Sequence, residues 1–211
     1  MKYTKIYIFI LIIGVIFFFN MNYVDKNTEY VDDLENLSDP IQTETSGGFD
    51  LKMDGWNVDV NYIAEYSISG KVVDVQDYYG VSFNDKLSPV DLGITWGFLA
   101  NDETLIWSSS GNRFLNWRGQ IRDINILGGE ERINCHFSNN HLIPCDRKVK
   151  KSIKSIKEDD YVKIDGYLVN IYATKSDGSY RYWNSSTTRT DSGDGACEVI
   201  YVKNVTWLKE K

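Results

Sequence analysis

The sequence predicts a mainly β protein with one short helix, preceded by an apolar N-terminal segment. Residues 159–173 are rich in β-branched and aromatic side chains, as expected of a strand, and Gly166 marks a bend or bulge in it. Just before it, residues 146–157 carry apolar side chains at helical spacing. Near the N-terminus, residues 6–19 form an apolar run broken only by Gly14.

The N-terminus predicts a transmembrane helix over residues 1–24. Lys2 and Lys5 precede an apolar run of about 14 residues, which is short for a span of about 20, although counting through Val24 lengthens it. The bulky residues 17–22 lack the small-residue cleavage site of a signal peptide. We therefore favour an uncleaved signal anchor, with a cleaved signal peptide and a buried helix as alternatives. The flanking charges predict a single-pass protein with its N-terminus in the cytoplasm and its folded domain extracytoplasmic, in the periplasm or on the cell surface.

Residues 25–50 predict an acidic flexible linker. They contain eight acids and one lysine, a net charge of −7, whereas residues 51–211 contain 20 basic and 22 acidic side chains, a net charge of −2. So polar a segment cannot bury enough apolar area to offset its ordering entropy, and a solvated spacer is favoured over a partner-binding role. The nearly neutral domain lacks the basic face of a nucleic-acid binder, so no nucleic acid is expected as a partner.

Residues 51–211 predict one β domain. Residues 92–100 are expected to pack on the core as a short strand or helix, and residues 132–144 to be extended until Pro144 stops them. The other expected strands alternate apolar with polar side chains or lie beside turn residues. They are residues 61–79 with a bend at Gly70, 104–107, 113–117, 159–173, 180–183 and 197–208.

Asp146 is predicted to cap a helix that begins at Arg147. Val149, Ile153 and Ile156 fall on one face of that helix, and basic side chains cover the rest. A basic helix can bind an anionic membrane or a polyanion, but more often its outer face is simply solvated. Strands before this helix, and a bent and a final strand after it, follow the order of an OB-like barrel.

The two histidines of the chain, His136 and His141, lie in one short window. On a regular strand they would point to opposite faces, so they share a site only if residues 138–140 form a turn or bulge. Two imidazoles with a sulfur or carboxylate would suit zinc. Because the spacing matches no strong zinc motif, no metal and no cofactor are predicted.

Residues 183–198 form a second polar cluster, which contains Trp183, Arg189, Asp191 and Cys197. A Cys197 thiol activated by His141 and oriented by Asn139 would be a nucleophile. The segment 191–195 superficially suggests calcium but lacks the ligand spacing of an EF-hand. The structural alternative, in which Arg189 pairs with Asp191 and hydroxyl groups hold the loop together, is favoured.

Three cysteines outside the cytoplasm favour a disulfide. A Cys135–Cys145 bridge would close the loop that holds both histidines and leave Cys197 as the odd thiol. Cys135–Cys197 and Cys145–Cys197 remain alternatives, as does the absence of any disulfide.

Five stretches of the chain resemble an uncharacterised family of bacterial membrane-anchored extracytoplasmic proteins. They span most of residues 60–205 and are residues 88–97, 110–113 with Trp117, 136–144, 165–169 and 183–198. The resemblance supports the domain and brings no established activity. In that family the position of Cys145 is usually a small residue, so a Cys135–Cys145 bridge would be peculiar to this chain.

We predict a non-enzymatic binding module of unknown ligand, held in the membrane by its N-terminal helix. Aromatic and arginine side chains on such barrels suit oligosaccharides, peptides or anionic groups. The candidate ligand-binding residues are His136, Asn139, His141, Trp183, Arg189, Asp191 and Cys197. One alternative is a thiol- or metal-dependent hydrolase. The other is a structural component of an envelope complex, whose partner would be an envelope protein.

Overall fold

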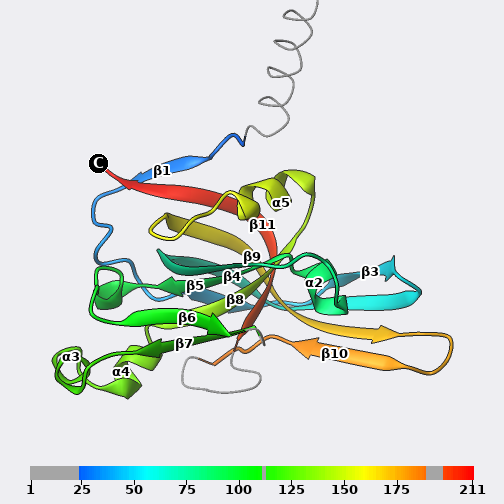
Figure 1. Ribbon diagram of the computed structural model, residues 1–211. Coiled ribbons are helices and arrows are strands. Elements are labelled where there is room, and N and C mark those ends of the chain that lie inside the picture. Colours follow the sequence, from blue (N-terminus) through cyan, green and yellow to red (C-terminus); the bar gives the residue numbers. More distant parts are fainter. Residues whose placement is uncertain (1–23, 111–112, 189–196) are drawn as a thin grey trace, which may run out of the picture.

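Five strands form a closed ring in the computed structural model, which describes residues 24–110, 113–188 and 197–211 (Figure 1). The strands are β4 (Trp56–Asp77), β5 (Val90–Thr95), β8 (Phe137–Pro144), β9 (Tyr161–Thr174) and β11 (Glu198–Glu210). They pair in the order β4–β5–β8–β11–β9 and back to β4, and only β8 and β11 run parallel. The prediction of a mainly β protein is confirmed.

Two strands of the ring carry extra residues, two in β4 and one in β11. The register shifts at Ile63 and Val73 in β4 and at Lys203 in β11, and such bulges raise the local twist that closes a sheet. Gly166 of β9 pairs with Val202, directly before the bulge at Lys203. A Cβ at Gly166 would lie 2.2 Å from the Tyr201 carbonyl oxygen, so the glycine permits a close approach of two backbones.

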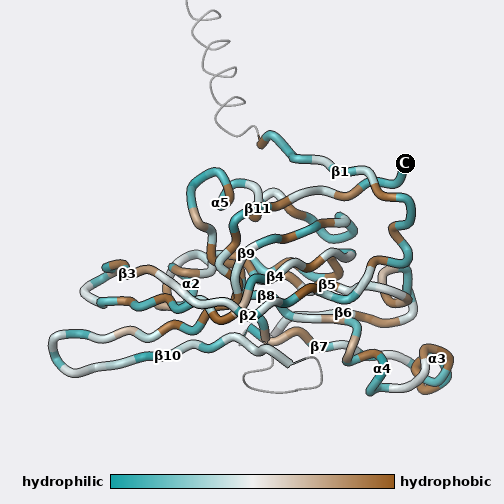
Figure 2. Tube along the Cα trace, turned by 180° about the vertical axis from the view of Figure 1, so that it is seen from behind, coloured by the Kyte–Doolittle hydropathy of each residue, from teal (hydrophilic) through white to brown (hydrophobic). Residues whose placement is uncertain are grey.

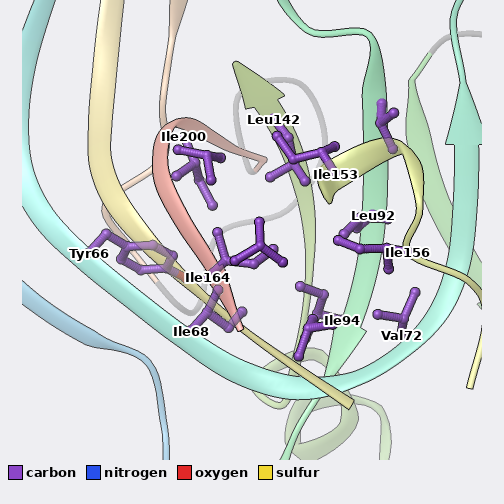
Figure 3. Packing of buried hydrophobic residues seen from close by; sticks show 14 of the residues in the cluster. Tyr66, Ile68, Val72, Leu92, Ile94, Leu142, Ile153, Ile156, Ile164 and Ile200 are labelled. Atoms are coloured by element: carbon purple, nitrogen blue, oxygen red, sulfur yellow. The ribbon is translucent and has the colours of Figure 1, made fainter. Parts of the chain in front are cut away.

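The predicted helix is α5 (Arg147–Lys154), and its inner face packs inside the ring. Asp146 caps the helix because its Oδ1 accepts a hydrogen bond of 2.8 Å from the Val149 amide. Ile153 and Ile156 point into the main apolar cluster of the ring (Figure 3). The fully buried side chains that they join include Ile68, Leu92, Ile94, Leu142, Ile164 and Ile200.

β4 and β9 extend beyond the ring and continue as a four-stranded antiparallel sheet. β3 (Gly48–Met53) pairs with the first half of β4, and β10 (Tyr180–Asn184) pairs with the second half of β9. Side chains alternate along this part of β4, with Asn57 and Asp59 exposed. The opposite face carries a second apolar cluster, built around Trp56, Val58, Val60, Val169 and Ile171.

The prediction of a single helix is wrong, because short helices also fill the connections. α2 (Phe83–Leu87) links β4 to β5, and its Ser82 and Asp85 form a capping box. The longer connection from β5 to β8 forms an insertion. Its elements are η1 (Gly97–Leu99), β6 (Ile106–Ser110), β7 (Phe114–Arg118), α3 (Ile121–Ile126) and α4 (Glu130–Asn134).

Within the insertion, the predicted pair of short β segments is confirmed as the β6–β7 hairpin. The predicted extended segment 132–144 is confirmed only from Phe137 onward, because α4 occupies its beginning. Gly128 and Gly129 both have φ near +94°, which turns the chain between α3 and α4. The Trp117 Nε1–H then donates a hydrogen bond of 2.9 Å to Asn134 Oδ1, which ties α4 to the hairpin.

The segment predicted as a flexible linker, residues 25–50, instead lies along the barrel. β1 (Thr28–Val31) pairs in parallel with the end of β11, and β2 (Ile41–Glu44) pairs with β4. Between them, the Leu37 carbonyl accepts a 3.1 Å hydrogen bond from the Gly97 amide. The segment is ordered because the edges of two long strands offer backbone groups for it to pair with, a gain that its polar composition does not reveal.

No helix within the three described ranges is both long and apolar enough to cross a membrane. The predicted signal anchor, up to residue 23, lies outside the described residues.

Candidate functional site

A cavity of about 700 Å³ opens between α2, both ends of β4 and the β9–β10 hairpin. Its volume lies within the range of about 300–1,000 Å³ that is usual for small-molecule sites. Aromatic rings and cationic side chains line it together with the acids Asp54 and Asp85. The rings are those of Trp56, Tyr78 and Phe83, and the cations are Lys86, Arg113, Lys175 and Arg181.

The β9–β10 hairpin places two cations over the aromatic wall. Gly178, with φ +85°, lies in the turn between the strands. The Lys175 Nζ lies 4.6 Å and the Arg181 guanidinium carbon 5.4 Å from the centre of the Trp56 ring. Lys86 pairs with Asp54, but neither Lys175 nor Arg181 forms an ion pair with any residue that the structure describes. The hairpin therefore presents positive charge to the cavity.

Arg113 forms the floor of the cavity. Its Nη1 donates a 2.7 Å hydrogen bond to Asp91 Oδ1, and its Nη2 donates to Asp85 Oδ1 at 3.0 Å and to the Ser88 carbonyl at 2.8 Å. Its guanidinium carbon lies 3.7 Å from the centre of the Tyr78 ring. Only 12% of the side chain is exposed, so Arg113 is an interior cation that holds α2, β5 and the end of β4 together.

A second layer beneath Arg113 consists of Asp91, His141 and Trp183. Asp91 and His141 are directly opposed in the β5–β8 register, and His141 Nδ1 lies 2.9 Å from Asp91 Oδ1. The centre of the Trp183 ring lies 5.0 Å from that of His141 and 5.4 Å from the Arg113 guanidinium carbon. Ser88 Oγ also donates to Asp91 Oδ1, at 3.2 Å. One oxygen of the buried Asp91 carboxylate, Oδ1, thus contacts Arg113, His141 and Ser88, while its Oδ2 has no hydrogen-bond partner among the described residues.

These charges shift the ionisation of two cavity residues. Burial raises the pKa of the Tyr78 phenol far above its usual range, and the Asp91 carboxylate raises it further while Arg113 opposes the shift. Burial would also raise the pKa of the Asp85 carboxyl, but hydrogen bonds from Ser82 and Arg113 outweigh it and lower that pKa. At neutral pH the floor therefore holds a neutral phenol beside charged Arg113 and Asp85.

Four of the predicted site residues come together, in the layer under the cavity. Asn139 Nδ2 donates a 2.6 Å hydrogen bond to the Arg113 carbonyl and lies 3.4 Å from Cys197 Sγ. His141 and Trp183 pack on each other, as described above. None of the four lines the cavity itself. They position Arg113 from below.

His136 lies away from this cluster. It directly precedes β8, where its ring packs on Phe98 with centroids 4.7 Å apart and its Nδ1 contacts the Arg132 carbonyl oxygen at 2.9 Å. Five residues of strand separate it from His141 by about 16 Å. The two histidines therefore share no site. Arg189 and Asp191, which were also predicted, lie outside the described residues.

The predicted Cys135–Cys145 disulfide is wrong. All three cysteines fall within the described residues, and none of them forms a disulfide. β8 runs between Cys135 and Cys145, and its length of about 26 Å far exceeds the Cα separation of about 7 Å that a disulfide allows. Cys197 Sγ instead lies 3.4 Å from Asn139 Nδ2, in the layer under the cavity.

The sequence interpretation did not identify the residues that build the cavity. Arg113 and Asp91 both lie in stretches that carry the family resemblance, and that was the available signal for them. No sequence signal pointed to Trp56, Lys175 or Arg181, because only the pairing of β3, β4, β9 and β10 brings them together.

No group of three histidine, cysteine, aspartate or glutamate side chains that could hold a metal ion occurs in the described part of the chain. In comparisons with known proteins, no family model, no curated protein and no solved structure matches this chain.

Proposed function

We propose that the protein is a membrane-anchored extracytoplasmic binding module, built on an OB-like barrel, that holds a small anionic ligand in the cavity between α2 and the β9–β10 hairpin. The order of three strands, a helix and two strands supports this fold. OB-type barrels bind ligands against strands two and three, between the loops after strands one and four. The corresponding loops here contain α2 and β10, and both line the cavity.

The observation that carries the proposal is the pair of cations on the β9–β10 hairpin. Lys175 and Arg181 lie over Trp56 and face the cavity, and neither forms an ion pair among the described residues, although the Asp177 carboxylate interacts with Lys175 at longer range. An anion there would meet a guanidinium and an ammonium group beside an aromatic wall. Lys86 and Arg113 are already paired with acids, so they support the site without adding free charge.

Calorimetric titration of the full chain in detergent micelles tests this proposal, with inorganic phosphate and phenyl phosphate as probes. Replacing Arg181 by alanine is expected to weaken binding of the preferred probe at least about tenfold, because a hydrogen bond to a charged group contributes roughly 1.5–3 kcal/mol. Lys175→Ala is expected to weaken it as well.

Arg122→Ala is the matched control, since Arg122 is exposed on α3 and does not line the cavity. It should bind like the unchanged chain. The proposal fails if neither probe binds, or if Arg181→Ala and Arg122→Ala bind equally well.

The envelope-complex alternative has one supporting observation. Three apolar side chains of the insertion are exposed, Ile106 by 55%, Ile121 by 80% and Ile126 by 72%. The α3 end of the insertion is coloured hydrophobic in Figure 2 and lies at the opposite end of the molecule from β1. A protein partner could cover these side chains while the cavity stays open. The hydrolase alternative has no comparable support.

A further inference from the structure

The outer face of α5 and of the turn that follows it is basic. Six cations lie there and all are exposed, whereas the buried positions are Ser152 and the apolar Val149, Ile153 and Ile156. The six are Arg147, Lys148, Lys150, Lys151, Lys154 and Lys157.

This basic face lies next to the point where the chain joins the domain. Lys26 Nζ lies 3.7 Å from Asp160 Oδ2, and the same oxygen accepts a 3.0 Å hydrogen bond from the Lys157 amide. The Asn27 carbonyl accepts a 2.8 Å hydrogen bond from the Trp207 amide, which fixes the start of β1 against β11. In Figures 1 and 2, α5, β1 and the C-terminus lie at one end of the molecule.

The stretch of chain between the predicted anchor and Lys26, where the chain joins the domain, is short. The strict apolar run ends at Phe19, seven residues before Lys26. Seven residues span at most about 25 Å when fully extended. An anchor that crosses the membrane therefore holds α5 within a few Debye lengths of the lipid headgroups, since one such length is about 8 Å at physiological salt.

Part of the acidic charge next to the join is compensated by lysines. Glu29 pairs with Lys163, Asp32 with Lys211, Asp159 with Lys71, and Asp160 with Lys26, whereas Asp25, Asp33 and Glu35 form no ion pair within the described residues. On the helix, Lys154 pairs with Asp77. Arg147, Lys148, Lys150 and Lys157 form no ion pair within the described residues, and neither do the two acids that adjoin them in the sequence, Asp146 and Glu158.

We infer that the outer face of α5 docks on the anionic headgroups of the membrane that the N-terminal segment crosses. This inference rests on the membrane anchoring in the proposed function, and not on the ligand. Docking fixes the orientation of the barrel, with α5 and β1 toward the lipid and β10 and the insertion away from it (Figure 1). A basic surface next to an anionic leaflet gains from each lysine that approaches it.

Lysine footprinting of the full chain in nanodiscs tests the inference. The chain is reconstituted in phosphatidylcholine alone or with a quarter of phosphatidylglycerol, labelled with a water-soluble acylating reagent and analysed by mass spectrometry. We expect Lys148 and Lys150 to be labelled at least about fivefold more slowly in the anionic discs. Lys52 on β3 and Lys175 in the cavity are matched controls and should be labelled equally in both lipids. Salt at 1 M should abolish the protection, because the Debye length falls to about 3 Å.

The outcomes separate the two proposals. A chain that does not enter the nanodiscs overturns the anchor. A chain that enters them, with Lys148 and Lys150 labelled equally in both lipids, overturns the docking alone. Protection by soluble heparin in neutral discs, with none from phosphatidylglycerol, also overturns it and identifies a polyanion as the partner of this face.

Discussion

Arg113 shows how one side chain can assemble a site from distant parts of the chain. Its guanidinium group joins Asp85 of α2 to Asp91 of β5, and it stacks on Tyr78 at the end of β4. Asn139 holds its backbone carbonyl from below. Because the carboxylate of Asp91 is buried, removal of the arginine would take away the guanidinium that pairs with it, a change that typically costs about 3–5 kcal/mol. The main role of Arg113 is therefore to stabilise the fold, and it also forms the floor of the cavity.

Tyr78 makes the stability of the domain depend on pH at the alkaline end. Its folded pKa lies above the unfolded value near 10, so its contribution is fully present below pH 10 and is lost as the pH rises further. Ionisation of the phenol should lower the free energy of unfolding by about 1.4 kcal/mol for each pH unit above 10. Replacing Tyr78 by phenylalanine should remove this pH dependence. Urea unfolding between pH 7 and 11 measures the effect.

Tyr79→Phe is the control for this experiment, because the adjacent Tyr79 is 89% exposed. It should follow the unchanged chain at every pH. Equal slopes for the two variants would show that Tyr78 does not ionise as described.

At this scale the sequence identified the lower layer of the site but not its upper wall. Asn139, His141, Trp183 and Cys197 were predicted from their residue types and do lie together. The predicted disulfide between Cys135 and Cys145 was wrong because an extended strand runs between them. Two residues that are close in the sequence can therefore lie far apart in space. Arg113 and Asp91 were not selected because their contact depends on tertiary structure, which no local pattern encodes.

Among the elements, α5 was the most predictable, because its cap and its apolar spacing are both local signals. Ile153 is fully buried in the ring. Its replacement by alanine should lower the free energy of unfolding by about 2–5 kcal/mol, since it leaves a cavity in a packed core. The midpoint and slope of urea unfolding provide the measurement.

Lys150→Ala lies on the exposed face of the same helix and should change stability by less than about 0.5 kcal/mol. Similar losses in Ile153→Ala and Lys150→Ala would mean that α5 does not fill the ring.

The less regular elements show why the rest of the fold was harder to predict. Gly166 does lie beside a register shift, but the extra residue is Lys203 of β11, where only the pairing of the strands reveals it. α4 occupies a segment predicted as extended because two glycines redirect the chain just before it. The order of the strands and the positions of the bulges depend on how distant segments pair. Local sequence patterns predict the structure within one segment much better than the pairing between segments.

For the molecule as a whole, residues 24–47, which contain β1 and β2, belong to the barrel. A chain that begins at Gly48 would lose β1 and β2 and so expose the edge of β4 that pairs with residues 41–44. Unpaired edges favour association between chains. We expect this chain to self-associate in sedimentation experiments and to unfold at lower urea concentration than a chain that begins at Val24.

The chain that begins at Val24 is the control, because it lacks only the predicted anchor. If residues 25–47 were a flexible linker, the two chains would sediment and unfold alike.

The parallel pairing of β1 with β11 has a mechanical consequence. Thr28 lies beside Trp207 and Val31 beside Glu210, so the two strands run side by side in the same direction. A force that draws the N-terminus toward a fixed support and the C-terminus away from it would slide these strands past each other. Sliding loads all the backbone hydrogen bonds of the pair at once, whereas peeling would break them one at a time. The parallel pair of β1 and β11 is therefore arranged to resist tension applied between the two ends of the domain.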